Sequence, residues 1–149
     1  MGIEKDINQY QFRNFYQKAE VNLIYTCNWI NEKLKQIIDE ADITTQQYNI
    51  LRILRGSKMP ISTLQIRDRM LDKMSDTSRI VDRLVKKGLA EKATCISDKR
   101  LVDIRISEKG LALLEHLDIR NADIDNIMHN LTEAEAIQLS YLLDKVREK

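Results

Sequence analysis

Basic and small polar side chains cluster in one short stretch of the sequence, between Met74 and Leu89. Arginine can donate two hydrogen bonds to the edge of a guanine base, and lysine attracts phosphate through its charge. The residues of this stretch that we expect to contact DNA are Ser75, Thr77, Ser78, Arg79, Arg83 and Lys86. The alternative is an ordinary amphipathic helix whose polar face is solvated.

This stretch also has the period of a helix, with Ser75 as the expected N-cap, Asp76 as the first helical residue and Gly88 at the end. Its apolar residues fall on one face and are Ile80, Val81, Leu84 and Val85. A recognition helix needs this division, because one face packs on the preceding helix while the other enters the major groove.

A second basic cluster lies at the tip of a predicted β-hairpin. Apolar and polar residues alternate in 102–106, and together with 89–94 this segment predicts two strands. The loop between them carries Asp98, Lys99 and Arg100. An arginine at such a tip suits a narrow minor groove, and Asp98 can hold Arg100 extended through a bidentate pair. The alternative is a solvated hairpin loop.

Helical periodicity accounts for most of the remaining chain. Apolar residues recur at three- or four-residue steps from Phe12 to Ala41, over roughly eight turns. Other expected helices begin at Thr44 or Thr45, at a Ser62–Gln65 capping box, at Ser107 and at a Thr132–Glu135 capping box, and end near Gly56, Met70, Asn130 and Val146. The sequence therefore predicts a mainly α fold with a small β-hairpin wing, a winged helix-turn-helix. The apolar stripes of the end helices exceed what one small core can cover, which points to a homodimer.

Charge is distributed unevenly, although the 149 residues carry a net charge of only +1. Between Arg52 and Lys109 there are 15 Lys and Arg against 8 Asp and Glu, and both ends of the chain are acidic. A basic surface suits phosphate backbones, so the middle of the chain is the expected DNA-binding part.

Enzymatic and metal-binding functions find little support in the sequence. There is no glycine-rich phosphate loop, nucleophile elbow or metal motif, and His116 and His129 are too far apart on one predicted helix to share an ion. We therefore expect no catalysis, cofactor or metal. The chain has no apolar run long enough for a membrane helix and no signal peptide, and a cytoplasmic location without membrane contact is expected.

The order of these motifs resembles one known family. The run Ile80–Leu89, then Lys92, then Asp98–Arg100, then Ile104–Gly110 looks like the signature of the MarR family. The resemblance covers nearly the whole chain. Its wing carries Lys99 where arginine is common, and the turn 71–74 is about one residue longer than in many members.

The resemblance implies a dimeric repressor that binds a near-palindromic operator in double-stranded DNA and is released by a small molecule. It implies a single domain, with a winged-helix lobe at about 44–109 and dimerisation helices at about 5–42 and 110–149. By position, Thr77, Ser78, Arg79 and Arg83 would address bases or nearby phosphates. Ser75 would cap the helix near a phosphate, Arg100 would enter at the wing tip, and Asp98 would orient it.

Family ligands are often aromatic and bind between the dimer helices and the DNA lobes. Residues that could line such a pocket are Tyr16, Tyr25, Trp29 and Tyr48, although aromatic residues at helical spacing more often belong to a core. Two alternatives stay open. One is a cysteine-based redox-sensing regulator using Cys95, since Cys27 is expected to be a buried structural thiol. The other is a winged helix that contacts protein instead of DNA, which has less need of Arg79, Arg83 and Arg100.

Overall fold

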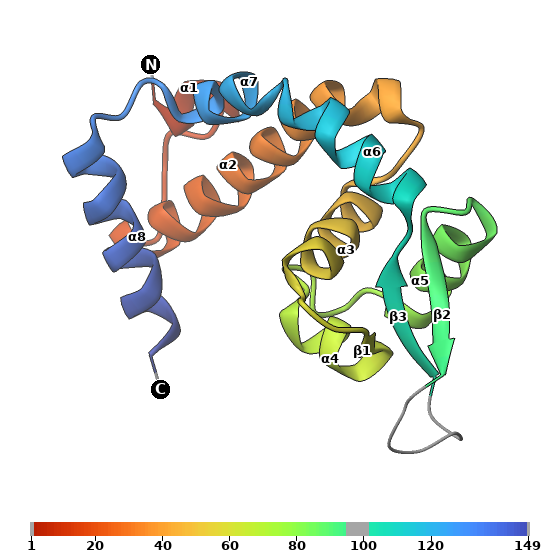
Figure 1. Ribbon diagram of the computed structural model, residues 1–149. Helices are drawn as coiled ribbons and strands as arrows, with labels where there is room; N and C mark the ends of the chain where they lie inside the picture. Colours follow the sequence, from red (N-terminus) through yellow and green to blue (C-terminus); the bar gives the residue numbers. More distant parts are fainter. Residues whose placement is uncertain (1, 95–101, 149) are drawn as a thin grey trace.

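The computed structural model describes residues 2–94 and 102–148 and shows a mainly helical chain with a small three-stranded antiparallel sheet (Figure 1). The elements in chain order are α1 (Ile3–Asp6), α2 (Phe15–Ile38), η1 (Asp39–Ala41), α3 (Thr45–Gly56), β1 (Ile61–Ser62), α4 (Thr63–Arg69), α5 (Thr77–Lys86), β2 (Ala90–Thr94), β3 (Val102–Ile106), α6 (Glu108–Asp118), α7 (Asn121–Asp125), η2 (Asn126–Met128) and α8 (Glu133–Arg147). The fold is a winged helix-turn-helix, as predicted.

Side-chain caps fix where several helices begin. Ser62 and Thr132 form the two predicted capping boxes, and Thr44 forms a third with Gln47. Ser107 accepts from the backbone N–H of Gly110 and starts α6. Each cap satisfies N–H groups that the first turn of a helix leaves without partners, so the sequence sets these boundaries locally.

The sheet joins the predicted hairpin to a strand that the sequence did not predict. Strand β3 pairs antiparallel with β2, with Glu91 opposite Arg105. On its other edge β3 pairs with β1, where Ile61 lies opposite Ile104. Two residues carry no alternation from which this strand could be predicted. The pairing depends on a partner more than forty residues away.

The hydrophobic core lies in the winged lobe and holds together α3, α4, α5, the sheet and α6. Its most deeply buried large side chains are Ile38, Ile50, Leu51, Ile66, Met70, Leu84, Ile104 and Leu114. The end of α2 reaches this core through Ile38, whereas α8 has no buried residue. The core therefore fixes the lobe, and most of α2 and all of α8 lie outside it.

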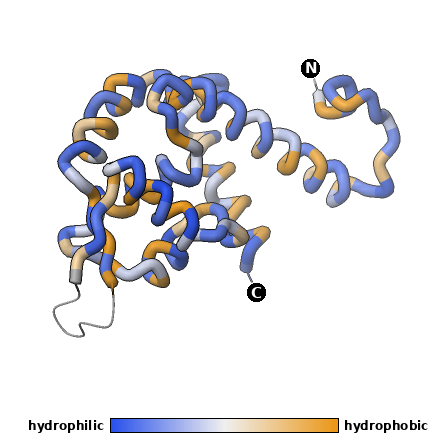
Figure 2. Tube along the Cα trace, turned by 90° about the vertical axis from the view of Figure 1, so that its right-hand side faces the viewer, coloured by the Kyte–Doolittle hydropathy of each residue, from blue (hydrophilic) through white to orange (hydrophobic). Residues whose placement is uncertain are grey.

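The helices at the two ends of the chain extend away from the lobe. Figure 1 shows α8 standing apart from α3–α5, and Figure 2 shows the N-terminal segment projecting from the rest of the molecule. Large apolar side chains remain exposed on these helices, among them Phe15, Tyr16, Ile24, Ile137, Tyr141 and Val146.

Several predicted boundaries were wrong. The first long helix begins at Phe15 after its N-cap Asn14, so Phe12 lies outside it, and the short α1 was not predicted. The end of α3 at Gly56 agrees with the prediction, and the chain passes directly into extended backbone at Ser57.

The helix predicted from Ser107 to Asn130 is divided at Ile119–Arg120. No Gly or Pro marks the division. Tertiary ion pairs flank it, since Asp118 binds Arg55 of α3 and Arg120 binds Asp123 and lies 3.8 Å from Glu40.

Candidate nucleic-acid interface

Helix α5 has its apolar face in the core and its basic face in solvent. Val81 and Leu84 are buried against the neighbouring elements. Arg79, Arg83 and Lys86 are exposed on the opposite side. The helix thus presents the predicted cations outward from a fixed base.

The N-cap of α5 is Asp76 and not the predicted Ser75. The Asp76 carboxylate accepts from the backbone N–H of Arg79 at 3.2 Å. Ser75 lies one residue earlier, and its hydroxyl donates to the carbonyl of Asp72 at 2.9 Å. Because the Ser75 hydroxyl is hydrogen-bonded within the preceding turn, Asp76 caps the helix instead. Asp76 also pairs with the Arg79 guanidinium, whose Nε lies 3.1 Å away, and so restrains a predicted base-reading side chain.

Gly88 closes the other end of α5. It has φ of +70°, and the N–H groups of Gly88 and Leu89 donate to Val85 and Leu84, both at 2.9 Å. These are the two bonds of a Schellman motif, which glycine permits because it has no Cβ. The reversal leads the chain straight into β2.

Lys87 links the end of α5 to the loop between α2 and α3. Its ammonium binds the carbonyl and, at 2.9 Å, the carboxylate of Asp42. Asp42 adopts a left-handed conformation with φ of +49°. Sequence reasoning missed this contact, because the two residues lie 45 positions apart. The contact positions the recognition helix relative to α2.

The predicted DNA-contacting residues are not equally exposed. Ser78, Arg79, Arg83 and Lys86 are exposed, and Ser75 is half-buried. Thr77 is only 3% exposed, so it differs from its neighbours in the first turn.

The wing is braced across its strands. Arg105 of β3 binds Glu91 of β2 through two nitrogen atoms at 3.0 and 2.8 Å, and Lys92 lies 3.3 Å from Asp82 of α5. The predicted tip residues Asp98, Lys99 and Arg100, together with Cys95, lie outside the described residues.

An ion pair joins the helix-turn-helix lobe to the helices beyond it. Arg55 of α3 binds both carboxylate oxygens of Asp118 of α6, at 2.6 and 3.2 Å. These hydrogen bonds raise the pKa of the Arg55 guanidinium and lower the pKa of the Asp118 carboxyl. Both side chains keep about a third of their surface exposed, so the pair adds orientation more than stability.

The aromatic residues predicted for a ligand pocket lie in different environments. Tyr48 is buried in the core, with the Arg52 guanidinium 5.7 Å from its ring centre. Tyr16 is 87% exposed on the outer part of α2, and Tyr25 is 41% exposed.

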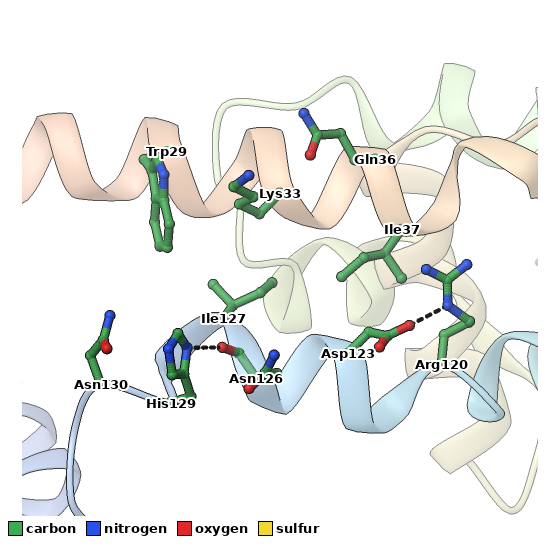
Figure 3. Close-up of a pocket in the computed structure, with 10 residues that line it drawn as sticks. All are labelled: Trp29, Lys33, Gln36, Ile37, Arg120, Asp123, Asn126, Ile127, His129 and Asn130. Atoms are coloured by element: carbon green, nitrogen blue, oxygen red, sulfur yellow. Dashed lines mark hydrogen bonds and ion pairs between the residues drawn. The ribbon is translucent and has the colours of Figure 1, made fainter.

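Trp29 lines a hollow of about 390 Å³ between α2 and the α7–η2 segment (Figure 3). Cationic Lys33 and Arg120 and apolar Ile37 and Ile127 also line it. The structure therefore places Trp29 at this hollow, and the three tyrosines do not line it.

Cys27 is exposed in the single chain, contrary to the prediction of a buried thiol. Among residues 2–94 and 102–148, no three His, Cys, Asp or Glu side chains gather as a metal site would require. Nor does any helix in those ranges combine the length and apolar composition needed to cross a membrane.

No protein-family model matches the chain. Individual relatives do. The multiple antibiotic resistance protein MarR of Escherichia coli is 29% identical over 123 residues, covering 78% of this chain and 85% of that protein. The HTH-type transcriptional repressor IacR of Pseudomonas putida is 27% identical over 133 residues, covering 89% of this chain and 76% of that protein.

Solved structures match over nearly the whole chain. A MarR variant from E. coli in complex with operator DNA superposes with a TM-score of 0.82 at 24% identity, over 93% of this chain and all of that one. BpsR of Bordetella bronchiseptica, whose structure concerns regulation of DNA binding by 6-hydroxynicotinic acid, gives 0.81 at 20% identity over 93% and 99%. With its exposed basic helix on a winged lobe, the chain is similar in sequence and in fold to MarR-family DNA-binding transcriptional regulators.

Proposed function

We propose that the protein is a homodimeric repressor that binds a near-palindromic operator and releases it on binding a small aromatic ligand. The observation that carries the DNA-binding part is α5, whose apolar face is anchored while Arg79, Arg83 and Lys86 are exposed. Lys99 and Arg100 at the wing tip, with Asp98 orienting Arg100, complete the proposed contacts. The operator complex of an E. coli MarR variant of the same fold supports this assignment.

Exposed apolar surface on the end helices supports the dimer. Ile137 is 65% exposed, Tyr141 61% and Val146 73%, and on α2 Phe15 is 88% exposed. Contiguous apolar surface of this kind in a single chain marks an interaction site. Because a symmetric dimer buries the same patch on both copies, a second copy covers these helices without a further partner. The proposed division is a winged lobe at about 44–109 and dimerisation helices at about 5–42 and 110–149.

The hollow at Trp29 supports a site for the ligand. It is lined by Trp29 and Lys33 of α2 and, on the facing segment, by Arg120, which is paired with Asp123. A ligand acts only through different affinities for the DNA-competent and released states, so it must alter the relative placement of the two lobes. Trp29 is the single tryptophan of the chain, so a ligand that binds in this hollow should change its fluorescence.

Fluorescence anisotropy tests the proposal, with the protein's own upstream promoter duplex and a scrambled duplex at two salt concentrations. Tight binding to the promoter alone, strongly weakened by salt, is the expected result. Absence of binding to either duplex at low salt would favour the protein-contact alternative. A panel of phenols and aromatic carboxylates added to the promoter complex should then include compounds that release DNA and shift Trp29 emission.

A further inference from the structure

A second hollow of about 350 Å³ lies in the helix-turn-helix itself, between α4 and the first turn of α5. Thr63 and Arg67 form its α4 wall. The α5 wall consists of the capping segment and the first turn, Ser75, Asp76, Thr77 and Ser78. Exposed Ser78, which we expect to contact DNA, stands at its edge, so the hollow opens beside the proposed DNA-binding face.

Thr77 has an unused hydrogen-bonding group at this hollow. The residue is 3% exposed, and its hydroxyl has no hydrogen-bond partner in the part of the chain that the structure describes. Buried polar groups are normally paired, and an unpaired one is costly. Threonine in a helix divides between two rotamers, and rotation about Cα–Cβ exchanges its hydroxyl with its methyl group. Such a rotation makes the hydroxyl available to a group seated in the hollow.

The start of α5 adds two further features that suit an anion. The first-turn N–H of Ser78 makes no hydrogen bond within residues 2–94 and 102–148, and the N-terminus of a ten-residue helix carries partial positive charge. Across the hollow, Arg67 is exposed and makes no ion pair with the described residues. An unpaired donor, a helix N-terminus and an arginine therefore converge on one space.

The Asp76 carboxylate narrows the choice of anion. It lies in the same wall and is only partly balanced by Arg79, whose Nε is 3.1 Å away. A free phosphate monoester carries a charge of about −1.5 to −2 at neutral pH and is repelled more strongly than a singly charged phosphodiester.

We propose that this hollow seats one phosphodiester of the DNA backbone, held by the Thr77 hydroxyl, the Ser78 N–H and the Arg67 guanidinium. The inference rests on the proposed DNA-binding function and deepens it. Thr77 and Arg67 then position the protein on the duplex and read no base. A contact of this kind fixes the register in which Arg79 and Arg83 meet the major groove.

Arg67→Ala in the full-length protein tests the charged part, with Arg69→Ala as a matched control from the same helix whose side chain is exposed but does not line the hollow. Anisotropy on the promoter and scrambled duplexes is measured across a salt series. Arg67→Ala should lower the salt slope by about 0.9 and weaken both complexes about eightfold at 0.1 M salt. Arg69→Ala should leave the slope unchanged. Equal losses of DNA affinity and salt slope in the two variants would contradict the proposed phosphodiester site.

Thr77→Val tests the hydroxyl. The replacement keeps the shape and removes the unpaired group, so the thermal midpoint at fixed protein concentration should rise by about 3 °C or more. Binding to both duplexes should nevertheless weaken severalfold, whereas Thr77→Ser should bind like the wild type. A stabilised Thr77→Val variant with unchanged DNA affinity would show that the hydroxyl is a buried defect and would overturn its assignment.

Inorganic phosphate at constant ionic strength separates a backbone seat from a free-anion site. We expect it to release no more DNA from the wild type than from Arg67→Ala. Selective release from the wild type would overturn the phosphodiester assignment. If the wild type binds no duplex at low salt, both the proposed function and the phosphodiester site are contradicted. If the wild type binds and both variants match it, the seat alone fails.

Discussion

Gly110 allows the wing and α6 to approach closely, and replacing it with alanine should destabilise the protein although it lies inside a helix. An added Cβ would lie 2.2 Å from the carbonyl oxygen of Leu89 and 2.8 Å from a side-chain carbon of Ile106. The Leu89 oxygen already accepts from the N–H of Ser107, the cap of α6. The clash therefore involves backbone at a point where β2, β3 and α6 meet.

The expected magnitude combines two opposing effects. Adding a side-chain carbon to a packed site destabilises a protein by about 1–3 kcal/mol. We take about 3 kcal/mol here, because the added Cβ meets backbone, which cannot move aside easily. Alanine is favoured over glycine in a helix by about 1 kcal/mol. The free energy of unfolding should thus fall by about 2 kcal/mol. With a urea dependence of about 2 kcal/mol/M, the midpoint should move down by about 1 M.

Urea denaturation at one fixed protein concentration measures this shift, since the apparent stability of the proposed dimer would depend on concentration. Gly56→Ala is the matched control. Gly56 is likewise a helical residue, the last of α3, but nothing lies within 4 Å of its added Cβ, so this variant should be as stable as the wild type or slightly more stable. A Gly110→Ala protein with the stability of Gly56→Ala would refute the close-contact reasoning.

Four further predictions concern function and assembly. Arg100→Ala should weaken promoter binding in anisotropy and leave the circular dichroism and oligomeric state unchanged; normal affinity would remove the wing from the interface. Arg83→Ala should reduce the preference for promoter over scrambled DNA if the side chain reads a base, whereas uniform loss with a salt slope lower by about one would assign it to a phosphate. A chain lacking Leu131–Lys149 should not dimerise stably in sedimentation, and a dimeric truncation would contradict the role of α8. Because Arg55 lowers the pKa of Asp118, the stability advantage of the wild type over Asp118→Asn should be present above pH 4 and lost as pH falls through the folded pKa; an advantage independent of pH would contradict this ion-pair account.

Local chemistry explains which elements could be predicted from the sequence. Capping boxes at Ser62 and Thr132 act within four residues, and the Schellman reversal at Gly88 needs a glycine, so these signals are legible without tertiary structure. The alternation at 102–106 likewise identified β3.

The features that were missed depend on distant residues. The cap of α5 moved from Ser75 to Asp76 because the hydroxyl of Ser75 found an acceptor in the preceding turn. The division after α6 has no helix-breaking residue and coincides with ion pairs to α3 and to η1. The Lys87–Asp42 contact joins residues far apart in sequence.

The structure was also needed to distinguish buried from exposed side chains among the predicted site residues. Helical spacing placed Thr77 beside Ser78, yet one is buried and the other exposed. Periodicity gives the face of a helix but not what covers that face. The same limit applies to Tyr48 and Tyr16, one of which lies in the core and the other in solvent.

The short strand β1 links the wing to α4, and this link bears on how the protein selects an operator. Ser62 is both the last residue of β1 and the cap of α4, and β1 pairs with β3 of the wing. We therefore expect the wing and α4 to contact DNA as one unit. In the proposed dimer, the lobe would then determine which bases are read within a half-site, and the helices outside it would determine the spacing between half-sites. Substitutions in one part can retune sequence preference while those in the other retune spacing, so the two properties can evolve independently.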